Sequence, residues 1–193
     1  MQARQRSSEW LISFPDSVVN MGSFICYLNK SLVSAKLPKY IPEIPYAMFY
    51  GCESLASIDM PDSVRSISSN VFSGCVNLAS VTIPEGVEEI GGFAFCECQA
   101  LVSVTIPDSV TFIDSGAFYE CDNLEAFIVP SGKLKLTREP FIYIVLYECP
   151  IADKLTVYCP DDSETMLCCV NEGIPHRSIE YASSSGSAQE GAD

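Results

Sequence analysis

Residues 61–129 repeat one sequence pattern three times without a gap, at 61–83, 84–106 and 107–129. Each copy begins with proline and an acidic residue, carries a Phe and a Cys three residues apart, and ends on alternating apolar and polar residues. A fixed period of 20 to 50 residues indicates stacked units, because one such unit cannot bury its apolar side alone. The sequence therefore predicts a solenoid in which equivalent residues form columns through the molecule.

Weaker copies lie on both sides of this region. Counting back by 23 from Pro61 gives Pro38 and then Pro15. Residues 15–37 fit the pattern least well, with Cys26 in the place of the Phe, and we interpret them as an N-terminal cap repeat because a terminal unit has one face in water. Regular repeats are expected over 38–129 and a degenerate repeat with an insertion over 130–160, which gives five to six repeats.

Each copy predicts two local structures. Its last residues alternate with period two, which indicates a short strand that the following proline ends. The Phe and Cys three residues apart fit a single helical or 3₁₀ turn. The largest apolar column is predicted to be a continuous aromatic ladder inside the solenoid, formed by Phe49, Phe72, Phe95 and Phe118.

The two ends of the chain carry different signals. Residues 1–14 are predicted to be an N-terminal segment that is partly disordered, with residues 1–9 frayed and Trp10, Leu11 and Ile12 packed on the first repeat. Residues 161–181 predict a C-terminal cap in which a capping box from Asp161 to Glu164 starts a helix, Gly173 ends it and a strand follows. Residues 182–193 are expected to be a disordered tail.

The charge of the chain limits its partners. Twenty-five acidic and 11 basic residues give a formal charge of −14, which disfavours phosphate backbones and anionic lipid surfaces. We therefore expect no nucleic-acid partner. No apolar run approaches the roughly 18 residues that a membrane span needs, and no signal sequence is recognisable. These features predict no membrane insertion, and a chain that is either cytoplasmic or a piece of a longer exported protein.

Ten cysteines would suggest disulfides in a small secreted protein, but Cys52, Cys75, Cys98 and Cys121 occupy one repeat position. Equivalent residues of stacked strands lie about 4.8 Å apart with parallel side chains, which is unsuitable for a disulfide. We interpret these four as small buried thiols. The other cysteines show no paired spacing typical of zinc sites, so no metal is predicted, with Cys96, Cys98, Cys168 and Cys169 as the least unsuitable ligands.

The repeat motif, Pro-Asp/Glu-x-Val-x-x-Ile followed by Phe-x-x-Cys-x-x-Leu-x-x-Val-x-Ile, resembles the BspA-like leucine-rich repeats. The resemblance covers residues 15–129, and residues 155–175 are similar to the strand-helix-strand unit that closes such arrays. It implies an α/β fold, a right-handed leucine-rich-repeat solenoid with a parallel sheet on one side. It also implies a cell-surface or extracellular protein that adheres to a protein partner, such as an extracellular-matrix or cell-surface protein. We expect a monomer.

Two sets of outward residues are candidates for protein binding. The first is the small polar face of the predicted sheet, which is either a contact surface or a plain solvated sheet because it lacks large anchor residues. The second is a set of exposed aromatics, which either form a binding patch or cover loop edges. The polar set consists of Ser57, Asp59, Ser80, Thr82, Ser103 and Thr105. The aromatic set consists of Tyr40, Tyr46, Tyr50, Phe93, Phe112 and Tyr119.

A third column, Asp16, Asp62, Glu85 and Asp108, stacks acidic side chains after the strand prolines. These carboxylates could hold Ca²⁺, or they could accept hydrogen bonds from backbone amides two residues further on, which is the stronger interpretation. No cofactor is predicted.

Catalytic residues are not predicted. His176 is the only histidine, no cysteine has a nearby partner for nucleophilic catalysis, and no glycine-rich phosphate loop is present. The favoured function is a non-catalytic binding or adhesion module. The alternatives are a structural spacer in a larger protein and a hydrolase acting at the inserted segment 140–150.

Overall fold

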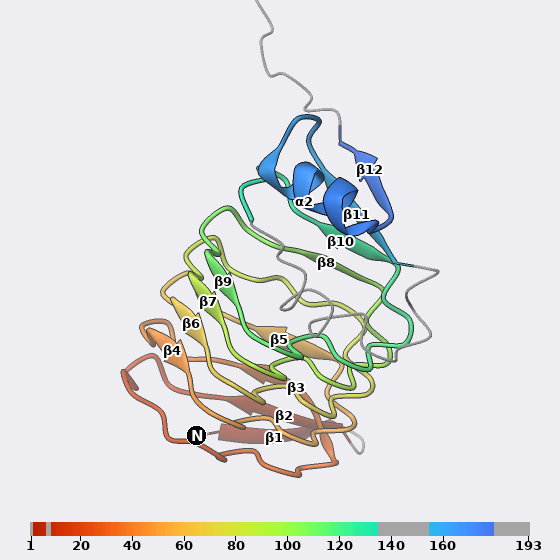
Figure 1. Cartoon of the computed structure of the whole chain (residues 1–193). Coiled ribbons are helices and arrows are strands. Elements are labelled where there is room, and N and C mark those ends of the chain that lie inside the picture. The colour runs from red at the N-terminus through yellow and green to blue at the C-terminus, as the bar shows by residue number, and fades with distance from the viewer. Residues whose placement is uncertain (1, 7–8, 135–154, 180–193) are drawn as a thin grey trace, which may run out of the picture.

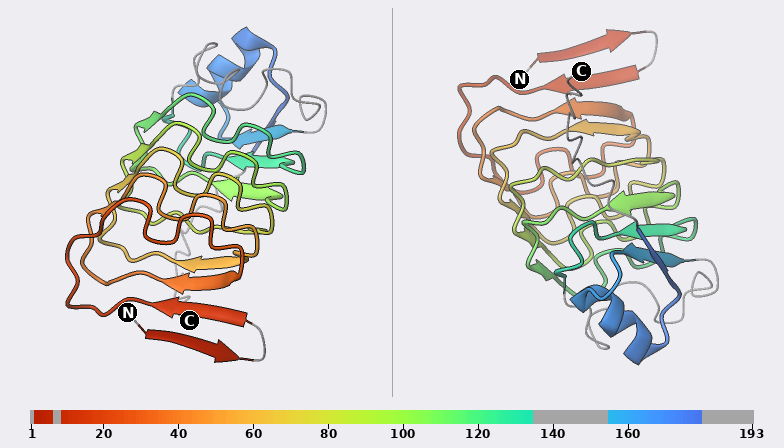
Figure 2. Two further views of the ribbon diagram at one scale, coloured as in Figure 1. Left: turned by 90° about the horizontal axis from the view of Figure 1, so that it is seen from below. Right: turned by 90° about the horizontal axis from the view of Figure 1, so that it is seen from above.

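The structure is a computed structural model that describes residues 2–6, 9–134 and 155–179. The chain winds into a β-solenoid of about six turns with a 23-residue period (Figure 1). We call the first five turns coils 1 to 5, which correspond to residues 15–37, 38–60, 61–83, 84–106 and 107–129. Figure 2 shows the coils stacked along one axis, with the N-terminal hairpin at one end and the helix at the other.

The predicted strands form the first wall. Two four-stranded sheets, in the orders β1-β2-β3-β5 and β12-β11-β10-β8, lie on this wall. All pairs are parallel except β1 with β2. The strands are β1 (Gln2–Arg6), β2 (Glu9–Ser13), β3 (Leu32–Lys36), β5 (Ser57–Asp59), β8 (Ser103–Thr105), β10 (Ala126–Ile128), β11 (Thr156–Cys159) and β12 (His176–Ser178).

The predicted register holds along this wall. Ser34 pairs with Ser57, and Ser103 pairs with Ala126, each 23 residues apart. Residues 80–82 are not a strand, so the two sheets are separated in coil 3. The predicted alternation is nevertheless present there, because Ser80 and Thr82 are exposed while Val81 is half-buried.

A second wall carries a parallel sheet that the sequence analysis does not predict. Its order is β4-β6-β7-β9, formed by β4 (Glu43–Ile44), β6 (Ser66–Ile67), β7 (Glu89–Ile90) and β9 (Phe112–Ile113). Each strand buries its isoleucine and turns the preceding residue outward. Strands of two residues are too short for period-two alternation to be recognised in the sequence.

The third wall, here called the turn wall, consists of residues 23–28, 46–51, 69–74, 92–97 and 115–120. In coil 1 the backbone N–H groups of Phe24, Cys26 and Leu28 donate to the carbonyls of coil 2 over 3.3, 2.9 and 2.7 Å. The acceptors are Tyr46, Met48 and Tyr50, and the same three bonds join coils 2 and 3, coils 3 and 4, and coils 4 and 5. All of them point toward the C-terminus, so they form three continuous chains of peptide groups that polarise one another.

The single turn predicted between the Phe and the Cys of each copy is present, since in coils 2 to 5 the Cys N–H donates to the carbonyl of the Phe three residues earlier, but its backbone is not that of a regular helix. Within each coil the wall has hydrogen bonds between residues three apart, such as Cys52 N–H to the Phe49 carbonyl at 3.1 Å. It is interrupted, however, by two positions with left-handed backbone, for example Phe24 with φ of 62° and Leu28 with φ of 54°. The equivalent residues in all five coils also have positive φ: 24, 47, 70, 93, 116 and 28, 51, 74, 97, 120. A continuous helix cannot form through such positions.

The predicted aromatic ladder is confirmed. The side chains of Phe49, Phe72, Phe95 and Phe118 are fully buried. Their rings stack with centroid separations of 5.6, 5.2 and 5.2 Å. Phe127 closes the ladder, with its ring edge-on to Phe118 at 5.6 Å. The column therefore supplies a continuous core through coils 2 to 5.

The interpretation of the cysteine column as buried thiols is also confirmed. Cys52, Cys75, Cys98 and Cys121 are free and fully buried. Each thiol donates to a backbone carbonyl of the preceding coil; for Cys75 the acceptor is the Phe49 carbonyl at 3.2 Å, and for Cys121 it is the Phe95 carbonyl at 3.0 Å. These bonds tie the cysteine column to the aromatic ladder.

Burial of the cysteine thiols makes the stability of the fold decrease at alkaline pH. It raises the pKa of the Cys26 thiol to about 11 and that of Cys52 to about 12, from an ordinary value of 9.0. A raised folded-state pKa means that the stabilisation is complete below about pH 9 and is lost as the pH rises toward 12. We expect the free energy of unfolding to fall between pH 9 and 10.5, by up to about 1.4 kcal/mol per pH unit for each thiol. In urea titrations Cys52→Ala should show a shallower decline, and parallel curves would contradict this.

Two strands lie in the N-terminal segment, where the sequence predicts fraying of residues 1–9. Strands β1 and β2 form an antiparallel hairpin, and β2 continues the first wall beyond β3. Ile12 packs into the core as predicted, whereas the side chain of Trp10 remains 40% exposed. The hairpin thus covers the first wall at this end of the solenoid.

The C-terminal cap contains helix α2 (Glu164–Glu172), as predicted. Its N-cap is Ser163 rather than Asp161, because the Ser163 hydroxyl accepts the Met166 N–H at 3.1 Å. Gly173 ends the helix with φ of 67°, and β12 follows. The buried Thr165 hydroxyl donates to the Leu134 carbonyl at 2.7 Å and attaches the helix to the solenoid. The predicted insertion and tail lie outside the described residues.

Candidate protein-binding surface

Among the residues that the structure describes, a group of aromatic side chains in mutual contact lies on the turn wall of coils 1 and 2. We call Phe24, Tyr27, Tyr46 and Tyr50 the N-terminal aromatic cluster. The Phe24 ring lies edge-on to Tyr27 and to Tyr46, both at 5.4 Å, and Tyr27 stacks on Tyr50 at 5.2 Å. Phe24, Tyr27 and Tyr46 remain between 45% and 52% exposed. The four rings therefore form one continuous aromatic surface with accessible faces.

The predicted aromatic candidates do not gather in one place. Tyr46 and Tyr50 join this cluster, while Phe93 and Tyr119 form a separate edge-on pair at 6.5 Å on the turn wall. Tyr40 lies beside a cleft with the Lys39 ammonium 5.2 Å from its ring centroid. Phe112 is exposed on β9 in the second wall.

The sequence analysis missed Phe24 and Tyr27. Both lie in the least regular copy, where Cys26 replaces the core Phe. The period nevertheless contained the information, because Tyr27 is 23 residues before Tyr50 and therefore stacks directly on it. Applying the period to coil 1 residue by residue would have found this contact.

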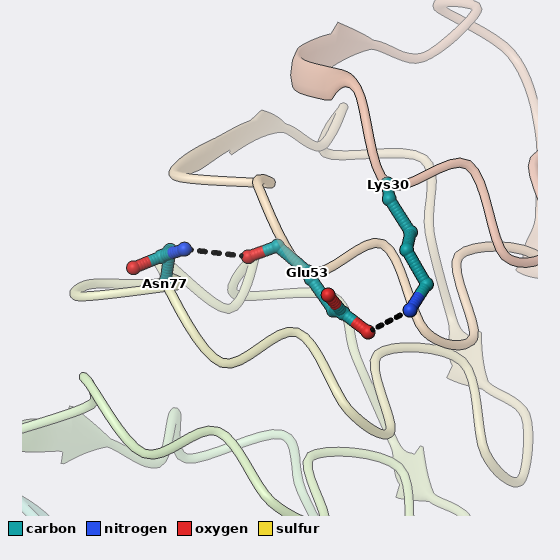
Figure 3. Close-up of polar contacts among 3 residues, drawn as sticks. All are labelled: Lys30, Glu53 and Asn77. Atoms are coloured by element: carbon teal, nitrogen blue, oxygen red, sulfur yellow. Dashed lines mark hydrogen bonds and ion pairs between the residues drawn. The ribbon is translucent and has the colours of Figure 1, made fainter.

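The small polar candidates lie where the strand pattern predicts. The side chains of this set are all exposed along the first wall: Ser57, Asp59, Ser80, Thr82, Ser103 and Thr105. Asp59 pairs with Lys36 at 3.1 Å, and both side chains are largely exposed. Figure 3 shows a second link between coils, in which Lys30 pairs with the Glu53 carboxylate at 2.7 Å and the Asn77 amide donates to the Glu53 carbonyl. These contacts connect coils but add no large anchor residue to the first wall.

A cleft of about 550 Å³ lies at the end of the first-wall strands in coils 1 to 3. Asp16, Lys39, Tyr40 and Asp62 are among its lining residues. The Asp16 carboxylate accepts the Lys39 backbone N–H at 3.3 Å, so its amide partner lies one coil further on rather than two residues away. Within residues 2–6, 9–134 and 155–179, no group of three or more His, Cys, Asp or Glu side chains is arranged to hold a metal ion.

Burial and hydrogen bonding define the environments of two further cysteines and of His176. Burial raises the pKa of Cys96 to about 11 and that of Cys169 to about 12, so these thiols stay protonated near neutral pH. His176 Nδ1 lies 2.8 Å from the Ile174 carbonyl. The inserted segment 140–150, to which the hydrolase alternative refers, lies outside the described residues.

Charge is distributed unevenly along the solenoid. Residues 1–39 carry five basic and two acidic residues, whereas residues 40–193 carry six basic and 23 acidic ones. Residues 66–132 contain no Lys or Arg at all. Residues 1–39, which include coil 1, therefore have an excess of basic residues, whereas coil 2 carries three acidic residues and one basic residue.

In the part of the chain that the structure describes, no helix is long and apolar enough to span a bilayer.

Comparisons with known proteins agree with this architecture. Residues 19–147 match the family described as the BspA type leucine rich repeat region, in six copies. No curated protein matches the sequence. Among solved structures, a leucine-rich repeat protein from T. pallidum is 24% identical with a TM-score of 0.63, and the alignment covers 91% of this chain and 94% of that one.

Two further solved structures share the fold over part of their length. A leucine-rich repeat protein from Bacteroides ovatus is 24% identical, with a TM-score of 0.62, and 81% of this chain aligns with 49% of that one. The pneumococcal vaccine antigen PcpA is 15% identical, with a TM-score of 0.69, and 87% of this chain aligns with 41% of that one. The family match spans most of the solenoid, and the chain belongs to the BspA-type leucine-rich repeat family.

Proposed function

We propose that the chain is a non-catalytic protein-binding module of the adhesion type, and that the N-terminal aromatic cluster is its main contact surface. The observation that carries this proposal is the contact between four aromatic rings, three of which remain about half exposed. Tyrosine and other large rigid side chains supply most of the binding energy in protein interfaces.

The turn wall gives the N-terminal aromatic cluster a rigid support. Each ring of the cluster is carried by the turn wall, whose backbone is held by three hydrogen bonds to the next coil. Ordering such a surface on binding therefore requires little loss of conformational entropy. The small polar side chains of the first wall, from Ser57 to Thr105, have no comparable anchor and would contribute secondary contacts.

The compartment forms part of the proposal. We place the module at the cell surface or outside the cell, with an extracellular-matrix or cell-surface protein as partner. Its family membership and its fold-level similarity to PcpA, a vaccine antigen, support this placement. The raised pKa values of the buried thiols of Cys52 and Cys169 are compatible with this placement, because protonated buried thiols resist oxidation.

A binding panel tests the proposal. The full chain would be titrated against immobilised extracellular-matrix proteins, with Tyr46→Ala combined with Tyr50→Ala as the test variant and Phe112→Ala as the control on another wall. We expect saturable binding that weakens at least about 30-fold in the double variant, because two anchors of this kind are worth about 2 kcal/mol or more. The control should bind like the wild type. No binding at high concentration would favour a spacer, and equal binding by all three proteins would mean that the contact surface does not include the aromatic cluster.

A further inference from the structure

The three hydrogen-bond chains of the turn wall end at coil 1 in carbonyls that receive no donor from the described part of the chain. In coils 2 to 5, twelve carbonyls at the equivalent positions each accept an N–H from the preceding coil. Their coil 1 counterparts are the carbonyls of Ser23, Ile25 and Tyr27. These three accept no hydrogen bond from any residue that the structure describes.

The side chains at this end are also unfinished. Ile25 belongs to a core column, since its counterparts Met48, Val71, Ala94 and Ala117 are fully buried. Ile25 is nevertheless 40% exposed. Terminal repeats normally turn a polar face to water, so an exposed core-column isoleucine marks a place where one more layer would fit.

Two neighbouring residues hold a strained backbone without gaining full burial. Phe24 and Leu28 have positive φ, a conformation that L-residues with bulky side chains rarely adopt, yet their side chains are 52% and 47% exposed. Leu28 packs against Gly51, where an added Cβ would lie 2.5 Å from its Cδ2. The same positive φ recurs at both positions in every coil, so it belongs to the repeat, and the exposure of these two apolar side chains is the relevant observation at coil 1.

The N-terminal hairpin does not cover this edge. Strand β2 pairs with β3 on the first wall, and β1 pairs with β2 beyond it. Figure 1 shows the hairpin aligned with the first-wall strands at the N-terminal end. The hairpin therefore leaves the turn wall of coil 1 uncovered.

We infer that the turn wall of coil 1 is a docking edge for an acidic, apolar segment of a partner protein, which adds to the solenoid as a further layer. This inference rests on the proposed function and specifies where and how the partner binds. Backbone N–H groups at alternate residues of the segment donate to the carbonyls of Ser23, Ile25 and Tyr27. The apolar side chains of the segment cover Ile25, Phe24 and Leu28. Its acidic side chains suit the net positive charge of residues 1–39, which contain five basic and two acidic residues.

The direction of the hydrogen bonds argues against a second copy that binds through the same edge. Two such edges would present carbonyl acceptors to each other, and neither would supply the donors. A partner segment has free backbone N–H groups and satisfies this requirement, as in strand addition to a sheet edge.

The test uses a capped nonapeptide of alternating Glu and Val residues, titrated into the full ¹⁵N-labelled chain. The carbonyls of Ser23, Ile25 and Tyr27 belong to the same peptide groups as the amide nitrogens of Phe24, Cys26 and Leu28. A donor that binds these carbonyls therefore changes the chemical shifts of those nitrogens. We expect saturable shifts of these three amide nitrogens. N-methylation of the three alternate donor amides of the peptide should weaken binding at least tenfold, whereas N-methylation of the other alternate set should leave it unchanged.

Protein variants separate this edge from the rest of the cluster. Ile25→Lys should abolish the peptide shifts while the thermal midpoint stays near that of the wild type, and Val102→Lys, also at an exposed apolar residue, should bind normally. Shifts that are absent, or that persist in Ile25→Lys or with either methylated peptide, would overturn the inference. If a matrix protein binds and loses affinity in the Tyr46 and Tyr50 double variant but not in Ile25→Lys, the proposed function stands and this inference fails. Concentration-dependent dimers that Ile25→Lys removes would also overturn it.

Discussion

Replacing Phe95 by alanine is expected to lower the free energy of unfolding by about 3 to 5 kcal/mol. Phe95 is fully buried and stacks on both neighbours of the ladder, with ring centroids 5.2 Å from Phe72 and 5.2 Å from Phe118. The truncation removes the transfer free energy of the ring and leaves a cavity between two coils that the rigid hydrogen-bonded walls prevent from closing. Urea denaturation followed by far-UV circular dichroism measures the loss.

Phe93→Ala provides the matched control for this prediction. Phe93 lies two residues from Phe95 but on the outer side of the turn wall, where its side chain is 43% exposed. Its replacement should cost no more than about 1 kcal/mol. Equal losses for the two variants would mean that the ladder is not the main core column. Because solenoid repeats contact only their neighbours, hydrogen exchange should rise most in coils 3 to 5 of Phe95→Ala.

The second large effect is expected at Gly91. A Cβ at this position would lie 2.5 Å from the backbone nitrogen of Ser69 and 2.8 Å from the carbonyl carbon of Ser68, both in the preceding coil. Gly91 also donates its N–H to the Ile67 carbonyl at 2.8 Å, so the two backbones are held close together. Gly91→Ala must separate coils 3 and 4 locally, and we expect a loss of about 2 to 3 kcal/mol.

Gly22→Ala is the control for Gly91. No atom lies within 4 Å of the Cβ that this substitution would add. Its effect on the free energy of unfolding should stay within about 0.5 kcal/mol. Thermal and urea unfolding measure the stability of both variants. Equal stability of Gly91→Ala and Gly22→Ala would contradict the close contact between coils 3 and 4.

Features that depend only on the period could be predicted from the sequence. The period places Phe72, Phe95 and the cysteines in columns, because stacking converts a sequence interval of 23 into direct contact. The positive φ angles could not be predicted, because this conformation normally indicates glycine, whereas Phe24, Leu28 and Glu97 adopt it here. The second sheet was missed for another reason: strands of two residues leave no alternation to read.

The candidate site was predicted only in part for similar reasons. Tyr46 and Tyr50 were recognised as outward aromatics, but their partners Phe24 and Tyr27 lie in the copy whose motif is most degraded. The N-terminal hairpin was not recognised because Gln2–Arg6 has no apolar alternation. Strand β1 is held by pairing with β2, and backbone pairing of this kind leaves no signature in side-chain hydrophobicity.

The aromatic cluster and its open edge both require coils stacked in a register of 23 residues, and through-hydrogen-bond scalar couplings test that register most directly. In the uniformly ¹³C,¹⁵N-labelled chain we expect couplings from the N–H groups of Phe49, Phe72 and Phe95 to the carbonyl carbons of Val71, Ala94 and Ala117. We expect none to the carbonyl carbons of Ser23, Ile25 and Tyr27. Couplings from these N–H groups to any other carbonyls, or to acceptors within the same coil, would contradict the stacked turn wall on which both the aromatic cluster and its open edge depend.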